Sequence, residues 1–147
     1  MRKIMLIAIA LVVMPTGLAQ ENDEREAVKQ AVLDYVEGIY EVDPSRIERS
    51  VHPDLAKRGF YRKQADLPYE TAAMTFEKLV NLAKNYNKAG KVPKGAPKEV
   101  IIYEVLDQTA TVKLVAEWGI DYMHLAKYEG KWMIVNVLWQ VHPPRKN

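Results

Sequence analysis

One short stretch of the chain gathers side chains that can bind an anion, at His52, Lys57 and Arg58. Histidine changes its protonation state near neutral pH, and an arginine guanidinium can hold a carboxylate at two points. These residues are therefore a candidate clamp for an anionic or polar ligand at the mouth of a pocket. The alternative, which we favour, is a set of solvated cations stabilised by the dipole at the C-terminal end of a helix.

A second set of polar residues lies among apolar neighbours near the C-terminus, at Asp121, Tyr122 and His124. Side chains alternate between the faces of a strand, so Tyr122 and His124 share one face and Asp121 points to the other. His124 is a candidate general base, with Tyr122 or Tyr35 orienting a substrate. The alternative, which we favour, is a core histidine hydrogen-bonded to a helix tyrosine. Asp121 is interpreted as an acceptor at a turn or at the end of a strand ladder.

Aromatic residues form a third candidate set, because their rings can stack on a flat ligand. Trp139 and Tyr122 are expected on the same face of the C-terminal hairpin. Packing within the core or between subunits explains these rings equally well. The candidate ligand-binding residues are, in total, Tyr35, Tyr40, His52, Arg58, Tyr122, His124 and Trp139.

Several kinds of chemistry are excluded by what the sequence lacks. The chain has no cysteine, hence no disulfide, no thiolate nucleophile and no cysteine metal ligand. Its three histidines form no HxH or HExxH pattern, and no GxSxG motif, phosphate-binding loop or nucleotide fingerprint occurs. We therefore expect no metal and no cofactor, and no residue is assigned as catalytic.

The N-terminus has the pattern of a secretory signal peptide. Arg2 and Lys3 precede the uncharged apolar run Ile4–Met14, and the small residues Gly17 and Ala19 stand three and one positions before the expected new N-terminus, Gln20. The apolar run is too short to span a bilayer comfortably. No cysteine follows the cleavage position, which excludes a lipid-anchored lipoprotein.

We therefore predict a signal peptide over residues 1–19, one mature domain over residues 20–147, and export to the periplasm or secretion. Removing residues 1–19 takes away two positive charges and no negative ones, so the formal net charge falls from +2 to zero. No uniformly basic face is implied, and nucleic acid is not an expected partner. The membrane is not expected as a partner either, once the signal peptide has been removed.

The first half of the chain predicts helices, which apolar spacings of three and four indicate. Asp23 and Glu26 form a candidate capping box, and Asp43 with Pro44 can begin a second helix. In order, the expected elements are helices over Asp23–Val42 and Pro44–Val51, a loop with a short extended piece over Asp54–Arg62, a helix over Tyr69–Tyr86, and a polar loop over Asn87–Lys98.

The second half predicts strands over Glu99–Leu106, Thr109–Trp118, Asp121–Tyr128 and Lys131–Val141. Their short connections indicate an antiparallel meander. A two-residue turn at Glu129–Gly130 sets the register of the last two strands and puts Tyr122, His124 and Trp139 on one face. Both faces of this hairpin are mostly apolar. One face must pack on the helices, and the simplest cover for the other is a second copy of the protein.

Helices followed by strands indicate an α+β fold, and the residue pattern resembles a known family. The residues that carry the resemblance are His52-Pro53-Asp54-Leu55, Lys57-Arg58-Gly59, Asp121-Tyr122, His124-Leu125, Lys127, Gly130, Trp132 and Ile134–Trp139. They are similar to the NTF2-like (SnoaL-like) superfamily and, more narrowly, to the family named Putative lumazine-binding. This resemblance implies a cone, in which N-terminal helices pack on a curved antiparallel meander, with a pocket at its wide end and frequent homodimers.

We therefore predict an exported homodimer that binds a small apolar or aromatic molecule without transforming it. Enzymes of the superfamily include dehydratases and isomerases, so the resemblance also implies an alternative in which His124 and tyrosine or aspartate groups move protons. A third alternative is a structural or interaction module whose cone is filled by its own side chains. An open pocket with polar groups would favour binding or catalysis, whereas a filled cone would favour the third alternative.

Overall fold

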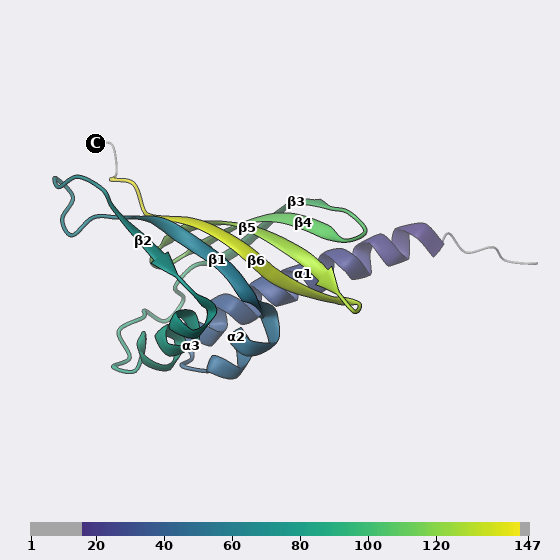
Figure 1. Ribbon diagram of the computed structural model, residues 1–147, viewed down its shortest axis with the longest axis horizontal. Helices are drawn as coiled ribbons and strands as arrows, with labels where there is room; N and C mark the ends of the chain where they lie inside the picture. Colours follow the sequence, from purple (N-terminus) through teal and green to yellow (C-terminus); the bar gives the residue numbers. More distant parts are fainter. Residues whose placement is uncertain (1–15, 145–147) are drawn as a thin grey trace, which may run out of the picture.

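The computed structural model describes residues 16–144, so residues 1–15 of the predicted signal peptide lie outside the described part. The elements are, in order, α1 (Thr16–Tyr40), α2 (Pro44–Ser50), β1 (Val51–Tyr61), β2 (Glu70–Met74), α3 (Phe76–Asn85), β3 (Lys98–Val105), β4 (Thr109–Ala116), β5 (Gly119–Tyr128) and β6 (Lys131–Val141) (Figure 1). Helices pack on one curved sheet, which confirms the α+β class. Among the described helices, none is both long and apolar enough to cross a membrane.

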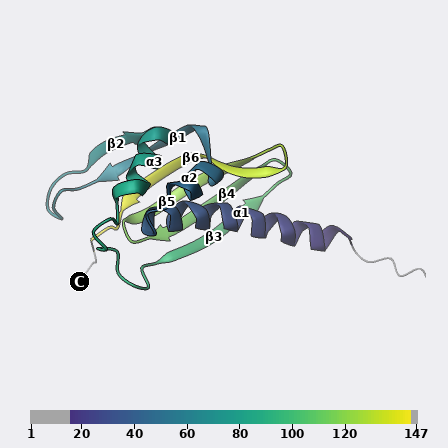
Figure 2. The ribbon, with the colours of Figure 1, turned by 90° about the horizontal axis from the view of Figure 1, so that it is seen from below.

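Helix α1 lies along the concave side of the sheet (Figure 2). Its buried side carries residues spaced by three and four, namely Val28, Ala31, Val32, Tyr35, Val36 and Ile39. Burying a side chain of this kind contributes about 1.5–3 kcal/mol. The expected capping box is wrong, because the helix starts at Thr16 and both Asp23 and Glu26 lie inside it. The preceding Leu18–Glu21 segment consists of good helix formers, which continue the helix past Asp23.

Helix α2 begins as predicted. The side chain of Asp43 accepts a hydrogen bond from the backbone N–H of Ser45 at 3.0 Å, and Pro44 takes the first helical position. The helix ends at Ser50, ahead of His52–Pro53, because the residue before a proline avoids the helical conformation.

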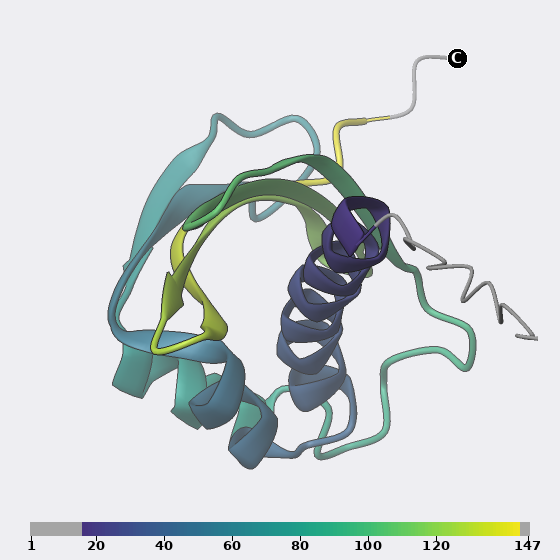
Figure 3. The same cartoon turned by 90° about the vertical axis from the view of Figure 1, so that its right-hand side faces the viewer.

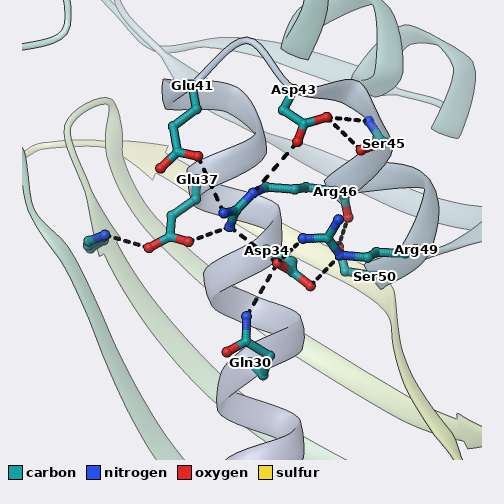
Figure 4. Close-up of polar contacts among 10 residues, drawn as sticks. Gln30, Asp34, Glu37, Glu41, Asp43, Ser45, Arg46, Arg49 and Ser50 are labelled. Atoms are coloured by element: carbon teal, nitrogen blue, oxygen red, sulfur yellow. Dashed lines mark hydrogen bonds and ion pairs between the residues drawn. The ribbon is translucent and has the colours of Figure 1, made fainter.

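A network of ion pairs holds α2 against α1 (Figure 4). The guanidinium of Arg49 donates to both carboxylate oxygens of Asp34, from Nε at 2.8 Å and from Nη2 at 2.6 Å. Arg46 pairs with Glu37, and Lys98 of β3 pairs with the same carboxylate. The Arg49 bonds lower the pKa of Asp34, and Lys98 together with Arg46 lowers the pKa of Glu37. The network fixes the direction in which α2 leads into β1.

The residues expected to form a loop after α2 are instead an interior strand, β1. It pairs with β6 in parallel and with β2 in antiparallel fashion. The inward-facing positions of β1 are Leu55, Lys57 and Gly59, so the alternation of apolar and polar residues that marks a strand is missing. The register shifts around Pro53, which cannot donate to the ladder.

The expected third helix over Tyr69–Tyr86 is only partly right. Its first residues form the edge strand β2, and α3 begins after Thr75, whose hydroxyl accepts a hydrogen bond from the backbone N–H of Lys78 at 3.4 Å. The alanines and methionine of β2 favour a helix locally. Pairing with β1 therefore overrides local propensity.

One six-stranded sheet runs in the order β2-β1-β6-β5-β4-β3. Strands β3 to β6 form the predicted antiparallel meander, and β1 adds to it in parallel, so the sheet is mixed. The sheet curves around α1, while α2 and α3 lie beside one end of the curve (Figure 3). The concave side is therefore the inner face of the protein.

The hairpin of β5 and β6 turns at Glu129 and Gly130, whose φ angles are 50° and 79°. Tyr128 pairs with Lys131, as the sequence predicted. Two positive φ angles in a two-residue turn match the right-handed twist of the strands that it joins.

Beyond this turn, a β-bulge changes which residues of the hairpin share a face. Leu125 pairs with Ile134 but His124 pairs with Asn136, so the register slips by one residue at Val135.

The slip pairs Asp121 with Trp139 on the inner face and Tyr122 with Leu138 on the outer face. The expectation that Tyr122, His124 and Trp139 share one face is therefore wrong. A bulge of one residue moves every later side chain of that strand to the opposite face.

Candidate functional site

A cavity of about 150 Å³ lies between the inner face of the sheet and the helices. Its lining residues are Tyr35, Ile39, Lys57, Met74, Leu82, Tyr86, Trp118 and Trp139. Among these lining residues, Lys57 alone carries a charge. The cavity is thus an aromatic and aliphatic space with one cationic group in its wall.

The backbone of β1 comes very close to β6 beside this cavity. A Cβ atom at Gly59 would lie 2.2 Å from the backbone oxygen of Trp139 and 2.5 Å from its ring. Only glycine allows this approach, which sets the position of the Trp139 indole in the cavity wall.

Three polar side chains from three elements meet beside the cavity. The hydroxyl of Tyr35 donates to Oδ2 of Asp121 at 2.9 Å and accepts from Nζ of Lys57 at 2.6 Å. Nζ of Lys57 lies 3.6 Å from the same Oδ2. The indole N–H of Trp118 donates to Oδ1 of Asp121 at 2.9 Å. The side chains of Lys57 and Asp121 are only 5% and 0% exposed, so they form a buried ion pair.

Burial controls the protonation of this group. Burial, with the charge of Asp121 adding to it, raises the pKa of Tyr35 well above its usual value, so the phenol stays protonated at neutral pH. Burial also lowers the pKa of Lys57, while the nearby carboxylate of Asp121 opposes that shift.

Aromatic rings pack around Trp118 at one side of the cavity. Its ring contacts those of Tyr35, Tyr40 and Tyr86 edge to face, with centroids 5.7–6.1 Å apart. The hydroxyl of Tyr86 donates to Glu117 at 2.6 Å, and burial together with this bond raises the pKa of Tyr86. These contacts hold the indole of Trp118 between the cavity and Asp121.

A larger hollow of about 450 Å³ lies near the start of α1, next to Val105 and Leu106. Its wall is acidic and polar, with Glu21, Glu24, Asp107 and Lys127. Nζ of Lys127 bonds Glu24 at 2.5 Å, and the indole of Trp132 donates to the same carboxylate at 2.7 Å, so both groups are already engaged. Part of its wall is Gly17 and Gln20, on either side of the predicted cleavage position. The smaller cavity is therefore the better candidate site.

Two of the seven predicted ligand-binding residues, Tyr35 and Trp139, line the cavity. Tyr40 lies behind Trp118, where its hydroxyl donates to the backbone oxygen of Pro97 at 2.7 Å. The structure therefore keeps part of the predicted aromatic set together.

The other four lie away from the cavity. His52 stacks on Tyr128 near the β5–β6 turn, with ring centroids 4.4 Å apart. Arg58, Tyr122 and His124 are exposed on the outer face of the sheet. Because His124 is exposed on the outer face, its interpretation as a core histidine is wrong.

Sequence reasoning did not select Lys57 and Asp121 as interior site residues. The pattern favours a turn or ladder-end acceptor at Asp121, and at Lys57 a solvated cation over a ligand clamp at the pocket mouth. Hydrophobic periodicity could not have found them, because Lys57 stands between Leu55 and Gly59 on the inward face of β1 and breaks the apolar pattern. Within residues 16–144, no group of three or more histidine, cysteine, aspartate or glutamate side chains could hold a metal ion.

The same fold occurs in solved structures of NTF2-like proteins. One, of unknown function, is from Silicibacter pomeroyi, with 15% identity, a TM-score of 0.63, and coverage of 85% of this chain and 98% of that one. Another, also of unknown function, is from Shewanella baltica, with 18% identity, a TM-score of 0.59, and coverage of 84% and 97%. A third, from Novosphingobium aromaticivorans, is described as a Putative Scytalone Dehydratase, with 11% identity, a TM-score of 0.58, and coverage of 88% and 99%.

These likenesses confirm the predicted NTF2-like cone. The family model described as Putative lumazine-binding matches residues 23–140, so the chain belongs to this family. No curated protein matches the sequence significantly.

Proposed function

We propose that this protein binds a small, flat, largely apolar molecule in the cavity beside Lys57, without transforming it. The observation that carries the proposal is a buried ammonium in an otherwise apolar, aromatic wall. Ligand pockets commonly combine such walls with a few polar groups that fix the orientation of the ligand. The name of the family supports a ligand-binding role in general.

The arrangement of acid and base groups favours binding over catalysis. His124, the candidate base, is on the outer face of the sheet. Asp121 is fully buried and is not part of the cavity wall, and the Tyr35 hydroxyl is bonded to both Asp121 and Lys57. A substrate in the cavity would therefore meet the ammonium of Lys57 but no carboxylate or imidazole base in the wall.

Filling the cavity tests this proposal. Leu82→Trp adds bulk at the cavity wall, and Leu106→Trp adds the same bulk at a position that is 56% exposed. Native mass spectrometry of protein from its own host should detect a small molecule on the wild type and on Leu106→Trp, but not on Leu82→Trp. Equal retention by Leu82→Trp would contradict the cavity as the binding site.

An enzyme of the dehydratase or isomerase kind is the second candidate. It is supported by the likeness to the protein described as a Putative Scytalone Dehydratase and by the buried contact of Tyr35 with Asp121. In this role Tyr35 and Lys57 would carry protons in place of His124. Turnover of the co-purified molecule, followed by NMR and lost in Tyr35→Phe, would establish the enzyme. A molecule that stays unchanged supports binding alone.

We further propose that the protein is a homodimer whose two subunits meet through the outer face of the sheet. Phe60, Tyr122 and Leu138 of β1, β5 and β6 are exposed there by 41%, 48% and 46%. Burial of such side chains against a second copy would remove apolar area from water.

We also propose that the protein is exported to the periplasm or secreted, on the N-terminal pattern from Arg2 to Ala19. N-terminal sequencing of protein from the cell envelope or medium should begin at Gln20. Intact Met1 on that material would reject cleavage at this position.

A further inference from the structure

We infer that the natural ligand is an uncharged, single-ring molecule whose carbonyl or ether oxygen accepts a hydrogen bond from the ammonium of Lys57. This inference rests on the proposed function, because it takes the cavity as the binding site. The donor capacity of Lys57, the charge balance around it and the size of the cavity each restrict the ligand in a different way.

Lys57 has donor capacity to spare. An ammonium carries three N–H donors and no acceptor. In the described part of the chain, Nζ of Lys57 donates one hydrogen bond, to Tyr35 at 2.6 Å. The oxygen of Asp121 at 3.6 Å is beyond hydrogen-bond length. A buried donor without a partner is unfavourable, and an oxygen atom of a ligand would satisfy it.

The charge balance excludes an ionised ligand. The charges of Lys57 and Asp121 already compensate each other across 3.6 Å. A carboxylate ligand would add a second negative charge close to Asp121, and Lys57 is the one charged residue in the cavity wall. A cationic ligand would face the ammonium directly. Burying an uncompensated charge in either case is strongly unfavourable, so the ligand is neutral.

The size of the cavity limits the ligand to about one ring. An apolar cavity of about 150 Å³ in another protein holds benzene, and this cavity has the same volume. A bicyclic pteridine such as lumazine, from which the family is named, has a second fused ring that would extend beyond this space.

Lys57 also fixes where the ring of the ligand lies. Its Nζ is 5.5 Å from the centroid of the Trp139 ring and 5.3 Å from that of Tyr35. An oxygen that reaches Nζ therefore brings its attached ring beside the indole of Trp139, where stacking adds to the affinity.

A matched set of probes tests these restrictions on the full chain. Acetophenone, ethylbenzene and benzoate share one benzene ring and differ in carrying a neutral acceptor, no acceptor and a negative charge. Affinities at pH 7 would be measured by titration calorimetry and by quenching of tryptophan fluorescence. We expect acetophenone to bind about tenfold more tightly than ethylbenzene, and benzoate to bind at least tenfold more weakly than ethylbenzene.

A variant pair assigns the preference to Lys57. Lys57→Met removes the hydrogen-bond donor and roughly keeps the length of the side chain, so the affinity for acetophenone should fall to the affinity for ethylbenzene. Because this change leaves Asp121 without its cation, the double variant Lys57→Met/Asp121→Asn provides a neutral background. A melting curve would confirm that each variant is folded before binding is compared.

The outcomes separate this inference from the proposed function. If benzoate binds more tightly than acetophenone, the inference of an uncharged ligand is overturned. If acetophenone and ethylbenzene bind with equal affinity, the hydrogen bond from Lys57 to the ligand is overturned. Lumazine binding more tightly than acetophenone would overturn the size limit. If none of these molecules binds to the wild type, the cavity itself is refuted as a site.

Discussion

The ammonium of Lys57 and the carboxylate of Asp121 are buried together, although removing either charge from water is unfavourable. Hydrogen bonds offset that desolvation. Asp121 accepts from Tyr35 and Trp118, and Tyr35 also accepts from Lys57. These four side chains come from α1, β1, β5 and the β4–β5 connection, so the contacts join the helix to both halves of the sheet.

Removing the Tyr35 hydroxyl should therefore be costly. Tyr35→Phe takes one donor from Asp121 and the hydrogen-bond acceptor from Lys57, and we expect the free energy of unfolding to fall by about 1–3 kcal/mol. Urea denaturation measures this change. Tyr122→Phe is the matched control, because its ring is 48% exposed on the outer face, and it should change stability by less than about 0.5 kcal/mol. Similar losses in both variants would contradict the structural role of the Tyr35 hydroxyl.

Val42, between α1 and α2, has a φ angle of 59°, in the left-handed region that β-branched residues avoid. Val42→Gly should raise the free energy of unfolding by about 1 kcal/mol, because glycine adopts this conformation without strain. Thermal unfolding followed by circular dichroism would show the gain. Ala27→Gly, at an exposed position inside α1, should instead lose about 1 kcal/mol. A loss of stability in Val42→Gly would mean that the valine side chain contributes more than its backbone strain removes.

At the scale of elements, the sequence predicted α2 and the meander well and predicted β1, β2 and the bulge poorly. The predicted elements follow from local signals, such as the Asp43 cap and the Glu129–Gly130 turn. Strand β1 lacks such a signal because its inward-facing Lys57 interrupts the apolar pattern. The residue that makes the cavity distinctive is thus also the residue that concealed the strand.

The bulge at Val135 could not be predicted, because the sequence of β6 is equally compatible with either register. Both faces of the hairpin are mostly apolar, so periodicity does not show where one residue is skipped. The sequence predicts Tyr122 and His124 on the same face as Trp139. Because of this slip, Asp121 shares the inner face with Trp139 instead. The candidate site was therefore predicted in part, through Tyr35 and Trp139, while its charged pair was assigned elsewhere.

The ion-pair network between α1 and α2 makes stability depend on pH. The folded protein lowers the carboxyl pKa values of Asp34 and Glu37 below the ordinary 3.8 and 4.5. Groups with lowered pKa values stabilise the fold above their ordinary pKa, and that contribution is lost as the pH falls through the folded value. The melting temperature should therefore decrease as the pH is lowered below about 4.5.

Asp34→Asn isolates the contribution of one carboxylate. This variant should melt at a lower temperature than the wild type at pH 7, and the difference should narrow as the pH is lowered through about 4. Glu48→Gln, at an exposed position of α2, is the control and should follow the wild type at every pH. A difference between Asp34→Asn and the wild type that stays constant from neutral to acidic pH would contradict the ionic role of Asp34.

At the scale of the whole molecule, the two faces of the sheet have different roles. The inner face packs on α1 and forms the cavity, whereas the outer face exposes Tyr122 and Leu138. The proposed dimer covers this outer face and leaves the cavity within each subunit. Assembly and ligand binding should therefore be separable by mutation.

Leu138→Asp tests this separation. A charge at the centre of the outer face should convert the dimer to a monomer, as measured by size-exclusion chromatography with light scattering. Leu106→Asp is the matched control, because its side chain is also exposed but lies at the β3–β4 turn, and it should stay dimeric. A wild-type protein that is monomeric at micromolar concentration would remove the proposed interface.

The place of β6 in the sheet has a consequence for the order in which the protein folds. β6 (Lys131–Val141) follows the other five described strands in the sequence, yet it lies in the interior of the sheet between β1 and β5. Until it leaves the ribosome, β1 and β2 have no connection to the β3–β5 part of the sheet. Contacts between residues so distant in sequence form slowly. The two parts of the sheet therefore cannot join until β6 has been synthesised and is free to pair with β1 and β5.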